Sequence, residues 1–227
     1  MERLLKLCGN AMAAFMDFGV GTFITALLGL AFGLELPAWA YLVGGVLGFL
    51  PDFDVIWSIL YRGHPQGDHH QTLMHRPIVI LPITAIAGWL LGGAFWSATA
   101  TACVFWHYLH DTPEFGGGGV AWFWPFSKKY WSFRNEWISP ERSVMANSET
   151  DHKSWIEETW LKPSAISCRE IEVGAISIGI ASTISEWGNR GWWSLVYGVT
   201  AWGLIWLLVL TIWMLWRDQQ TKNTART

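Results

Sequence analysis

Imidazole and carboxylate side chains are concentrated in one stretch of this chain. Six of the seven histidines lie between residues 64 and 110. Four aspartates fall in or beside the same window, namely Asp52, Asp54, Asp68 and Asp111. Together these two side-chain types suit zinc, iron or manganese better than calcium or copper(I). A metal held in this way acidifies a bound water molecule and makes hydroxide available near neutral pH. The stretch therefore predicts a metal site, and that site is expected to be hydrolytic.

The local spacing of these residues presents them in pairs. Asp52 and Asp54 follow Pro51, which interrupts a helix, so two carboxylates can be presented together with free backbone groups. His107 and Asp111 are four residues apart, which places both on one face of a helix. One rigid element would thereby offer two metal ligands.

The polar segment after Asp54 adds Asp68, His70 and His75. His69 and His70 are neighbours, so we expect only one of the two to face the site. Two further residues leave two interpretations open. His110 is either a second ligand beside His107 or a packed residue at the membrane interface. Asp17 either joins the site or caps the first apolar helix.

The composition indicates what must position these side chains. Hydrophobic residues make up 52% of the 227 residues, charged residues 15%, and mean hydropathy is +0.25. A soluble domain carries about 25% charged residues. The 18 Trp residues suit the membrane interface. The net charge of −3, without a basic stripe, argues against nucleic-acid binding. Three scattered cysteines argue against a thiolate metal site. These numbers predict an integral membrane protein.

About 20 apolar residues can cross a bilayer. The candidate spans are 11–33, 37–61 with an interruption at Pro51-Asp52, the two halves of 77–109 on either side of Gly92-Gly93, 172–187 and 192–216. The sequence thus predicts an all-α, polytopic helical membrane protein with four to six transmembrane helices. We divide it into a membrane core with the Asp/His site (1–127), a cytoplasmic loop (128–170) and C-terminal transmembrane helices (171–227).

The distribution of Lys and Arg sets the orientation. With six spans and the N-terminus inside, fourteen of the fifteen basic residues lie inside, and Arg190 is the exception. Both termini are therefore expected in the cytoplasm. On this topology the segments that carry the Asp and His residues all end at the cytoplasmic face.

Four motifs in this order resemble a bacterial family of membrane-bound, metal-dependent hydrolases whose founding member is LexA-regulated. They are Pro51-Asp52-Phe53-Asp54, the H-x4-H pattern from His70 to His75, the H-x3-D pattern from His107 to Asp111 followed by Thr-Pro, and Trp124-Pro125-Phe126-Ser127. The resemblance covers about residues 16–127. It implies metal ligands at Asp52, Asp54, His70, His75, His107 and Asp111.

The same resemblance implies a location in the bacterial inner membrane. The family's hydrolase label rests on similarity to zinc-dependent phospholipase C, which suggests a phosphoester or phospholipid substrate. This chain departs from the pattern at three places. Val20-Gly21 stands where members carry Thr-His, Gln71-Thr72-Leu73-Met74 stands where they carry Arg-Gly-x-Thr, and Arg76 follows His75 where they carry Ser.

Our leading hypothesis is a cytoplasm-facing hydrolase with one or two zinc ions, with iron or manganese as alternatives. Asp54 or Asp68 would be the general base. Arg76 would contact substrate phosphate, since guanidinium matches phosphate geometry. A metal transporter or sensor is an alternative, although the ionisable residues crowd one end of the spans instead of following a path through the bilayer. A catalytically inactive membrane scaffold is the third hypothesis. The sequence predicts contact with the lipid bilayer but no oligomeric state.

Overall fold

The computed structural model describes residues 14–62, 70, 72–112, 119–132, 136–138 and 165–190. Its helices are α2 (Phe15–Ala31), α3 (Ala38–Gly48), α4 (Phe53–Arg62), α5 (Pro77–Asp111) and α7 (Ala165–Arg190). Two 3-10 turns, η1 (Leu50–Asp52) and η3 (Leu73–His75), and two short antiparallel strands, β1 (Tyr130–Ser132) and β2 (Glu136–Ile138), complete this part of the chain. The predominantly helical fold is confirmed. Asp68, His69, the expected span 192–216 and most of the expected loop 128–170 lie outside the described residues.

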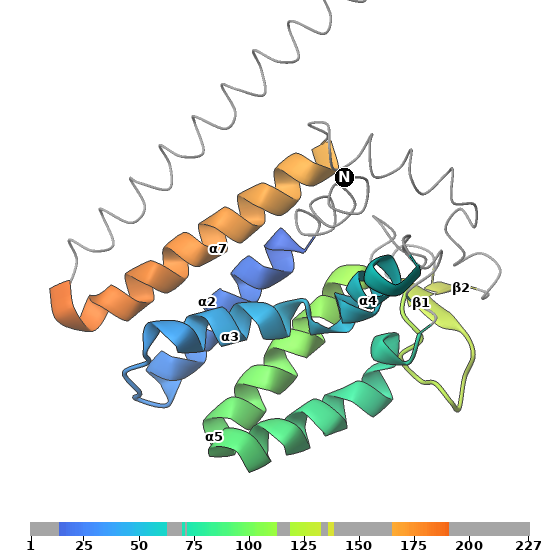
Figure 1. Ribbon diagram of the computed structural model, residues 1–227, viewed down its shortest axis with the longest axis horizontal. Helices are drawn as coiled ribbons and strands as arrows, with labels where there is room; N and C mark the ends of the chain where they lie inside the picture. The colour runs from blue at the N-terminus through green and yellow to red at the C-terminus, as the bar shows by residue number, and fades with distance from the viewer. Residues whose placement is uncertain are drawn as a thin grey trace, which may run out of the picture.

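Helix α2 is the central element and packs against α3, α5 and α7 (Figure 1). Glycines allow this close packing. A Cβ atom on Gly19 would lie 2.3 Å from the carbonyl oxygen of Gly174 in α7, and one on Gly21 would lie 2.3 Å from that of Gly44 in α3. Small residues at such contacts let helix backbones approach closely within a membrane. The first turn of α2, which carries Asp17, is thereby brought among three other helices.

Helix α5 is broken into two arms that fold back on each other (Figure 1). The break lies at Gly92 and Gly93, as the sequence predicted, and Gly93 has φ of +73°, a conformation that favours glycine. Ser97 Oγ on the second arm donates a hydrogen bond to the Ala85 carbonyl on the first, at 2.8 Å. Further along, Ile80 and Val104 share one buried cluster. The start and the end of α5 therefore lie at the same end of the molecule.

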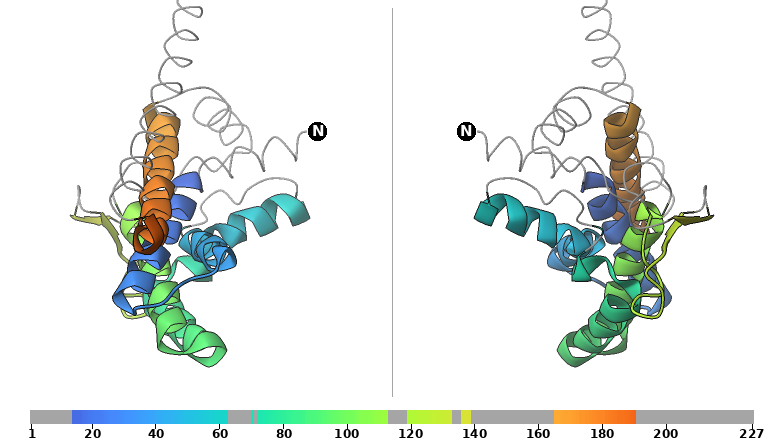
Figure 2. Two further views of the ribbon diagram at one scale, coloured as in Figure 1. Left: turned by 90° about the vertical axis from the view of Figure 1, so that its left-hand side faces the viewer. Right: turned by 90° about the vertical axis from the view of Figure 1, so that its right-hand side faces the viewer.

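The chain also bends between α3 and α4. Pro51 lies in the η1 turn, and the two helices meet at an angle of 63°. The interruption that the sequence predicted at Pro51 is confirmed. Figure 2 shows α4 projecting sideways from the bundle. The bend leaves Asp52 in the turn and Asp54 in the first turn of α4.

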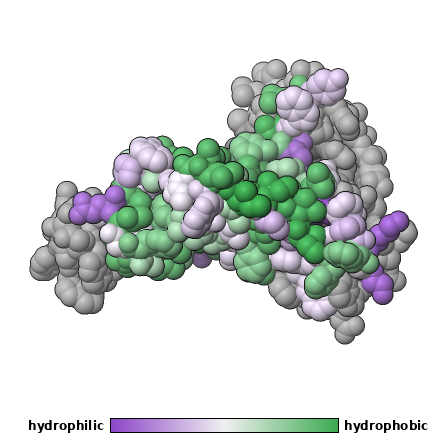
Figure 3. Space-filling view, turned by 90° about the horizontal axis from the view of Figure 1, so that it is seen from below, coloured by the Kyte–Doolittle hydropathy of each residue, from purple (hydrophilic) through white to green (hydrophobic). Residues whose placement is uncertain are grey.

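The apolar surface fits a membrane protein. Among the described residues, α5 is the one helix that is long and apolar enough to cross a membrane by itself, and α3 with α4 would form a second span only if the bent pair counts as one. Helix α2 is apolar but has 17 residues. Figure 3 shows hydrophobic side chains over much of one face. The number of spans and their orientation stay predictions.

Candidate metal centre

Three imidazole rings are oriented in the same way. Nδ1 of His75 lies 3.3 Å from Oδ2 of Asp54, and Nδ1 of His107 lies 3.3 Å from Oδ2 of Asp17. Nδ1 of His70 lies 3.3 Å from a backbone oxygen, that of Gly119. An oxygen acceptor at Nδ1 favours the proton on that nitrogen and leaves Nε2 with its lone pair, which is how metal-binding histidines are commonly held.

The Nε2 atoms of His75 and His107 face two carboxylate oxygens. His75 Nε2 lies 3.6 Å from Asp52 Oδ1 and 3.5 Å from Asp111 Oδ2. His107 Nε2 lies 3.5 Å and 3.1 Å from the same two oxygens, and the two Nε2 atoms are 3.4 Å apart. Tetrahedral zinc donors, bound at 2.0–2.1 Å, lie about 3.3–3.4 Å from one another. Each nitrogen–oxygen pair, and the pair of nitrogens, thus has a separation close to that of donors around one ion, and Asp52, His75 and His107 form one group whose donor atoms lie within 4.8 Å of one another.

His70 adds a further donor to this cluster. Its Nε2 lies 3.8 Å from Asp111 Oδ2, and its ring stacks on that of His75 with centroids 5.0 Å apart. His70, His75 and Asp111 form a second group whose donor atoms lie within 4.8 Å of one another, overlapping the group of Asp52, His75 and His107. His75 belongs to both groups, so either group of three offers a site for one ion.

Burial makes a cation necessary at this place. His70, His75 and His107 are buried, and Asp111 Oδ2 is buried without a hydrogen-bond partner among the described residues. Burial lowers the pKa of His75, but the carboxylates of Asp111, Asp52 and Asp54 around the ring outweigh burial and raise that pKa to about 10. Buried carboxylates are costly without a positive partner. The cluster therefore stabilises positive charge, which either a proton or a metal ion can supply.

The turn that carries His75 is fixed to α5. The Tyr108 hydroxyl donates a hydrogen bond of 2.6 Å to the carbonyl of Met74, and Tyr108 is fully buried. Because His107 precedes Tyr108 in α5, this bond holds the two imidazoles on neighbouring elements. The fold back at Gly92 and Gly93 is what brings those elements together.

Asp54 and Asp17 lie behind the imidazoles. Asp54 accepts a hydrogen bond from the Thr72 hydroxyl, on the Nδ1 side of His75. Asp17 is buried and accepts a 3.0 Å hydrogen bond from Trp106 Nε1. The sequence analysis expected Asp54 as a ligand or a base, and the structure places it next to the cluster of converging donors. It also brings Asp17, whose role the sequence left open, into direct contact with His107.

His110 and Glu170 extend the contacts of Asp17. His110 Nδ1 lies 3.3 Å from Asp17 Oδ2, and its Nε2 lies 3.5 Å from Oε1 of Glu170 in α7. The His110 ring stacks on Trp106. Sequence reasoning missed Glu170. The only signal was an acidic side chain at the edge of a segment rich in small and apolar residues.

Arg76 is buried under the motif that begins at Trp124. Its guanidinium carbon lies 5.8 Å from the centroid of Trp124 and 5.4 Å from that of Tyr130. Nη2 donates a hydrogen bond of 3.2 Å to the Tyr130 hydroxyl. The aromatic rings hold the cation in one orientation. Its role toward substrate phosphate stays a prediction.

Gly21 occupies the position where the resembling family carries His. It lies in the contact between α2 and α3, where a Cβ atom would be 2.3 Å from the Gly44 carbonyl oxygen and 3.1 Å from the Gly48 Cα. No side chain fits there with these helices so close. In this chain the aspartate one turn earlier, Asp17, is the α2 residue that reaches the histidines.

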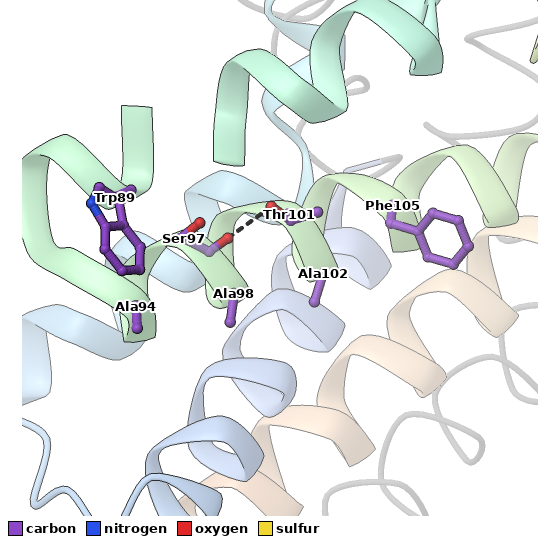
Figure 4. A pocket seen from close by; sticks show the side chains of 7 residues that line it. All are labelled: Trp89, Ala94, Ser97, Ala98, Thr101, Ala102 and Phe105. Carbon is purple, nitrogen blue, oxygen red and sulfur yellow. Dashed lines mark hydrogen bonds between the residues drawn. The ribbon is translucent and has the colours of Figure 1, made fainter. Parts of the chain in front are cut away.

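A separate hollow runs along the second arm of α5. It has a volume of about 440 Å³ and is open to the surface. Figure 4 shows its lining: Trp89, Ala94, Ser97, Ala98, Thr101, Ala102 and Phe105. None of these side chains is an acid, a base or a metal donor of the Asp/His type. The hollow is a surface of small residues and does not belong to the metal centre.

Comparison with known proteins identifies the family. A family model described as YdjM inner membrane protein matches residues 12–218, which include every described site residue. No curated protein and no solved structure matches the chain. The predicted membership of a bacterial inner-membrane family is confirmed, and the family description carries no statement about hydrolysis or metal. The chain belongs to the YdjM inner membrane protein family.

Proposed function

We propose that this protein is a membrane-bound, metal-dependent hydrolase of phosphoesters. Its ligands are Asp52, His70, His75, His107 and Asp111. The observation that carries the proposal is the shared orientation of three imidazoles, each held at Nδ1 by an oxygen and each turning Nε2 toward Asp111. Three nitrogen and two oxygen donors suit one or two zinc ions, or iron or manganese.

The chemistry that a bound metal supplies here is a water of lowered pKa and a Lewis acid for the phosphoryl oxygen. Asp54 stays one candidate for the base that takes a proton from that water, although its Oδ2 lies on the Nδ1 side of His75, away from the converging Nε2 atoms. Asp68, which lies outside the described residues, stays the alternative base. Substrate approaches past Asp52, whose side chain is 24% exposed while that of Asp111 is 12% exposed.

Arg76 follows His75 directly in the chain, and its guanidinium lies against the Trp124 and Tyr130 rings. A guanidinium that aromatic rings hold in place loses little conformational freedom when it binds an anion. This favours a phosphorylated substrate over a neutral ester or an amide. The hydrogen bond that Arg76 Nη2 donates to the Tyr130 hydroxyl would then control how the phosphate is received.

Transport of a metal ion fits the structure less well. A transport path needs ionisable groups along the membrane-spanning helices. The sequence from Pro77 to Trp106, which forms both arms of α5 apart from its last turn, contains no Asp, Glu, Lys, Arg or His. The same is true of α3. The polar groups lie at one end, as expected for a surface site.

The test is the metal content of detergent-purified protein, measured by elemental mass spectrometry. Wild type is compared with His75→Ala and Asp111→Ala, and Lys129→Ala, which changes an exposed side chain, serves as the control. We expect one or two zinc, iron or manganese ions per chain, lost in the first two variants only. Loaded wild type should hydrolyse a soluble phosphodiester, and His75→Ala should not. The proposal is overturned if wild type still holds no metal after reloading, or if His75→Ala hydrolyses the phosphodiester as wild type does.

A further inference from the structure

Helix α4 exposes one apolar face. Phe53, Trp57, Leu60 and Tyr61 are its exposed large side chains, and they recur at the spacing of a single helix face. Trp57 and Tyr61 are 69% and 76% exposed, and their rings stack in parallel with centroids 6.2 Å apart. Aromatic residues of this kind on a short amphipathic helix are typical of the lipid–water interface.

The start of α4 borders the candidate metal centre. Asp54, in the first turn of the helix, has its Oδ2 3.3 Å from Nδ1 of His75. Asp52 lies immediately before the helix, and its Oδ1 is 3.6 Å from Nε2 of the same ring. The ten-residue helix therefore borders the metal centre at its start and carries the exposed aromatic face along its length.

The direction of α4 fits a position at the membrane surface. Helix α3 is apolar and exposes Trp39, Leu42 and Val46, as a helix in contact with lipid does. The chain then turns by 63° at Pro51, and α4 leaves the bundle sideways (Figure 2). In an inner-membrane protein, a helix that turns away from an apolar neighbour in this manner runs more nearly along the membrane plane.

We propose that α4 lies in the lipid–water interface, with its aromatic face among head groups and upper acyl chains, and that the substrate is a phospholipid of the same bilayer. Its phosphoester would reach the metal centre past Asp52, at the start of α4, without the lipid leaving the membrane. The identity of the substrate rests on the proposed hydrolase function. The position of α4 does not, so the two parts can fail separately.

The position of α4 is tested by spin labelling. Single cysteines at Trp57 and Tyr61 are introduced into the full chain with its three native cysteines replaced, labelled, and reconstituted in nanodiscs. Lys129→Cys, at an exposed site after the Trp124 motif, is the control. We expect labels 57 and 61 to favour collisions with oxygen over a water-soluble nickel chelate, and label 129 to show the reverse. Equal nickel accessibility at all three positions overturns the proposal. A short distance between labels on two copies also overturns it, since a second chain would then cover the face.

The substrate is tested with vesicles of phosphatidylethanolamine and phosphatidylglycerol beside a soluble phosphodiester. In Trp57→Ser/Tyr61→Ser, the ratio of lipid to soluble hydrolysis should fall at least tenfold. The matched control is Ile83→Ser/Ile86→Ser, which removes exposed apolar side chains from α5, and its ratio should stay at the wild-type value. An unchanged ratio in the α4 variant overturns the lipid substrate. Wild type that holds no metal and hydrolyses neither substrate overturns the proposed function instead, and the labelling result still decides the position of α4.

Discussion

The two best-defined histidines of the metal centre, His75 and His107, are held by different kinds of structure. His75 is supported by groups close to it in sequence: Asp54 from α4 and, through Asp54, Thr72. His107 is supported from across the bundle. Its partner Asp17 comes from α2 and also contacts His110, which in turn contacts Glu170 of α7.

Because of this difference, substitutions around His75 should affect metal binding, whereas substitutions around His107 should also affect the stability of the fold. Asp54 belongs to a helix that leaves the bundle, so a change there should disturb the metal and little else. Asp17 is buried among α2, α5 and α7, where its two oxygens are close to three ring nitrogens, those of Trp106, His107 and His110. A change at Asp17 should disturb the metal and also the packing of the helices.

The largest loss of metal affinity is expected at Asp111, which lies near Nε2 of both His75 and His107. Asp111 Oδ2 lies near Nε2 of three histidines, whereas Asp52 Oδ1 lies near two. Asp111→Asn should therefore weaken zinc affinity more than about 100-fold, beyond the range seen for groups that only orient ligands. Asp52→Asn should weaken it less. Competition titrations with a chromophoric chelator measure both constants. A larger effect at Asp52 would contradict the assigned geometry.

Substitution of Asp17 or Asp54, the carboxylates that contact Nδ1 of His107 and His75, should weaken metal binding to a similar degree. The two substitutions should differ in their effect on protein stability. Asp17→Asn and Asp54→Asn are each expected to reduce affinity about 10- to 100-fold, because each replaces the charged acceptor that orients an imidazole by a neutral amide. Asp17→Asn should also lower the melting temperature of the metal-free protein more than Asp54→Asn does, since it alters a fully buried charge network. Thermal unfolding in detergent, followed by circular dichroism, measures this. Equal losses of melting temperature would remove the distinction between the two sides.

Metal affinity should depend on pH because the His75 ring must lose a proton before it binds the metal. The pKa of His75 is raised to about 10 from 6.5, so the ring is protonated near neutral pH without metal. Metal binds neutral imidazole, so binding must displace this proton. The apparent affinity should then rise about tenfold per pH unit from this group and level off above its pKa. In the metal-free protein, the stability that the charged ring contributes is complete below pH 6.5 and is lost as pH rises through 10.

Calorimetry in buffers of different ionisation enthalpy counts the protons released at pH 7. At least one proton per metal is expected. Asp54→Asn should reduce the number, because it removes one of the carboxylates that raise the pKa of His75. Metal binding without proton release would show that His75 does not lose a proton to become a metal ligand.

The smallest effect is expected at Glu170, which acts on the centre only through His110 and Asp17. Glu170→Gln should weaken metal affinity by about twofold to tenfold, less than loss of a direct partner. It should also shift the visible absorption of the cobalt-substituted protein. Glu172→Gln, the same change on the same helix, is the control and should leave both unchanged. A lower melting temperature with an unaltered cobalt spectrum would mean that Glu170 only fastens α7 to the bundle.

The sequence predicted the parts of this structure that depend on local geometry. The spacing of His107 and Asp111, the interruption at Pro51 and the break at Gly92-Gly93 each follow from rules that act within a few residues, and the helices form accordingly. The placement of Asp54 did not follow from its motif. The short turn at η1 leaves Asp52 facing Nε2 of His75 and Asp54 facing Nδ1, so two aspartates in one motif meet opposite sides of a ring.

Asp17 and Glu170 could not be assigned from the sequence for a different reason. Their contacts depend on how α2 and α7 pack, and that packing depends on small residues such as Gly19 and Gly174 meeting across 155 positions of the chain. No local pattern encodes such a meeting. The membrane location was predictable, since composition alone carries it, whereas metal and substrate stay proposals.

The bend in α5 bears on how the protein enters the membrane. Its first arm, residues 77–91, would be about 22 Å long at 1.5 Å per residue. That is shorter than the hydrocarbon core of about 30 Å. Its far end presents Leu90 and Leu91, which are 77% and 88% exposed, and no polar loop. Such a hairpin can insert from the side where His75 and Asp111 remain, with no hydrophilic segment to be translocated. The metal-binding residues would then stay together on one side throughout biogenesis.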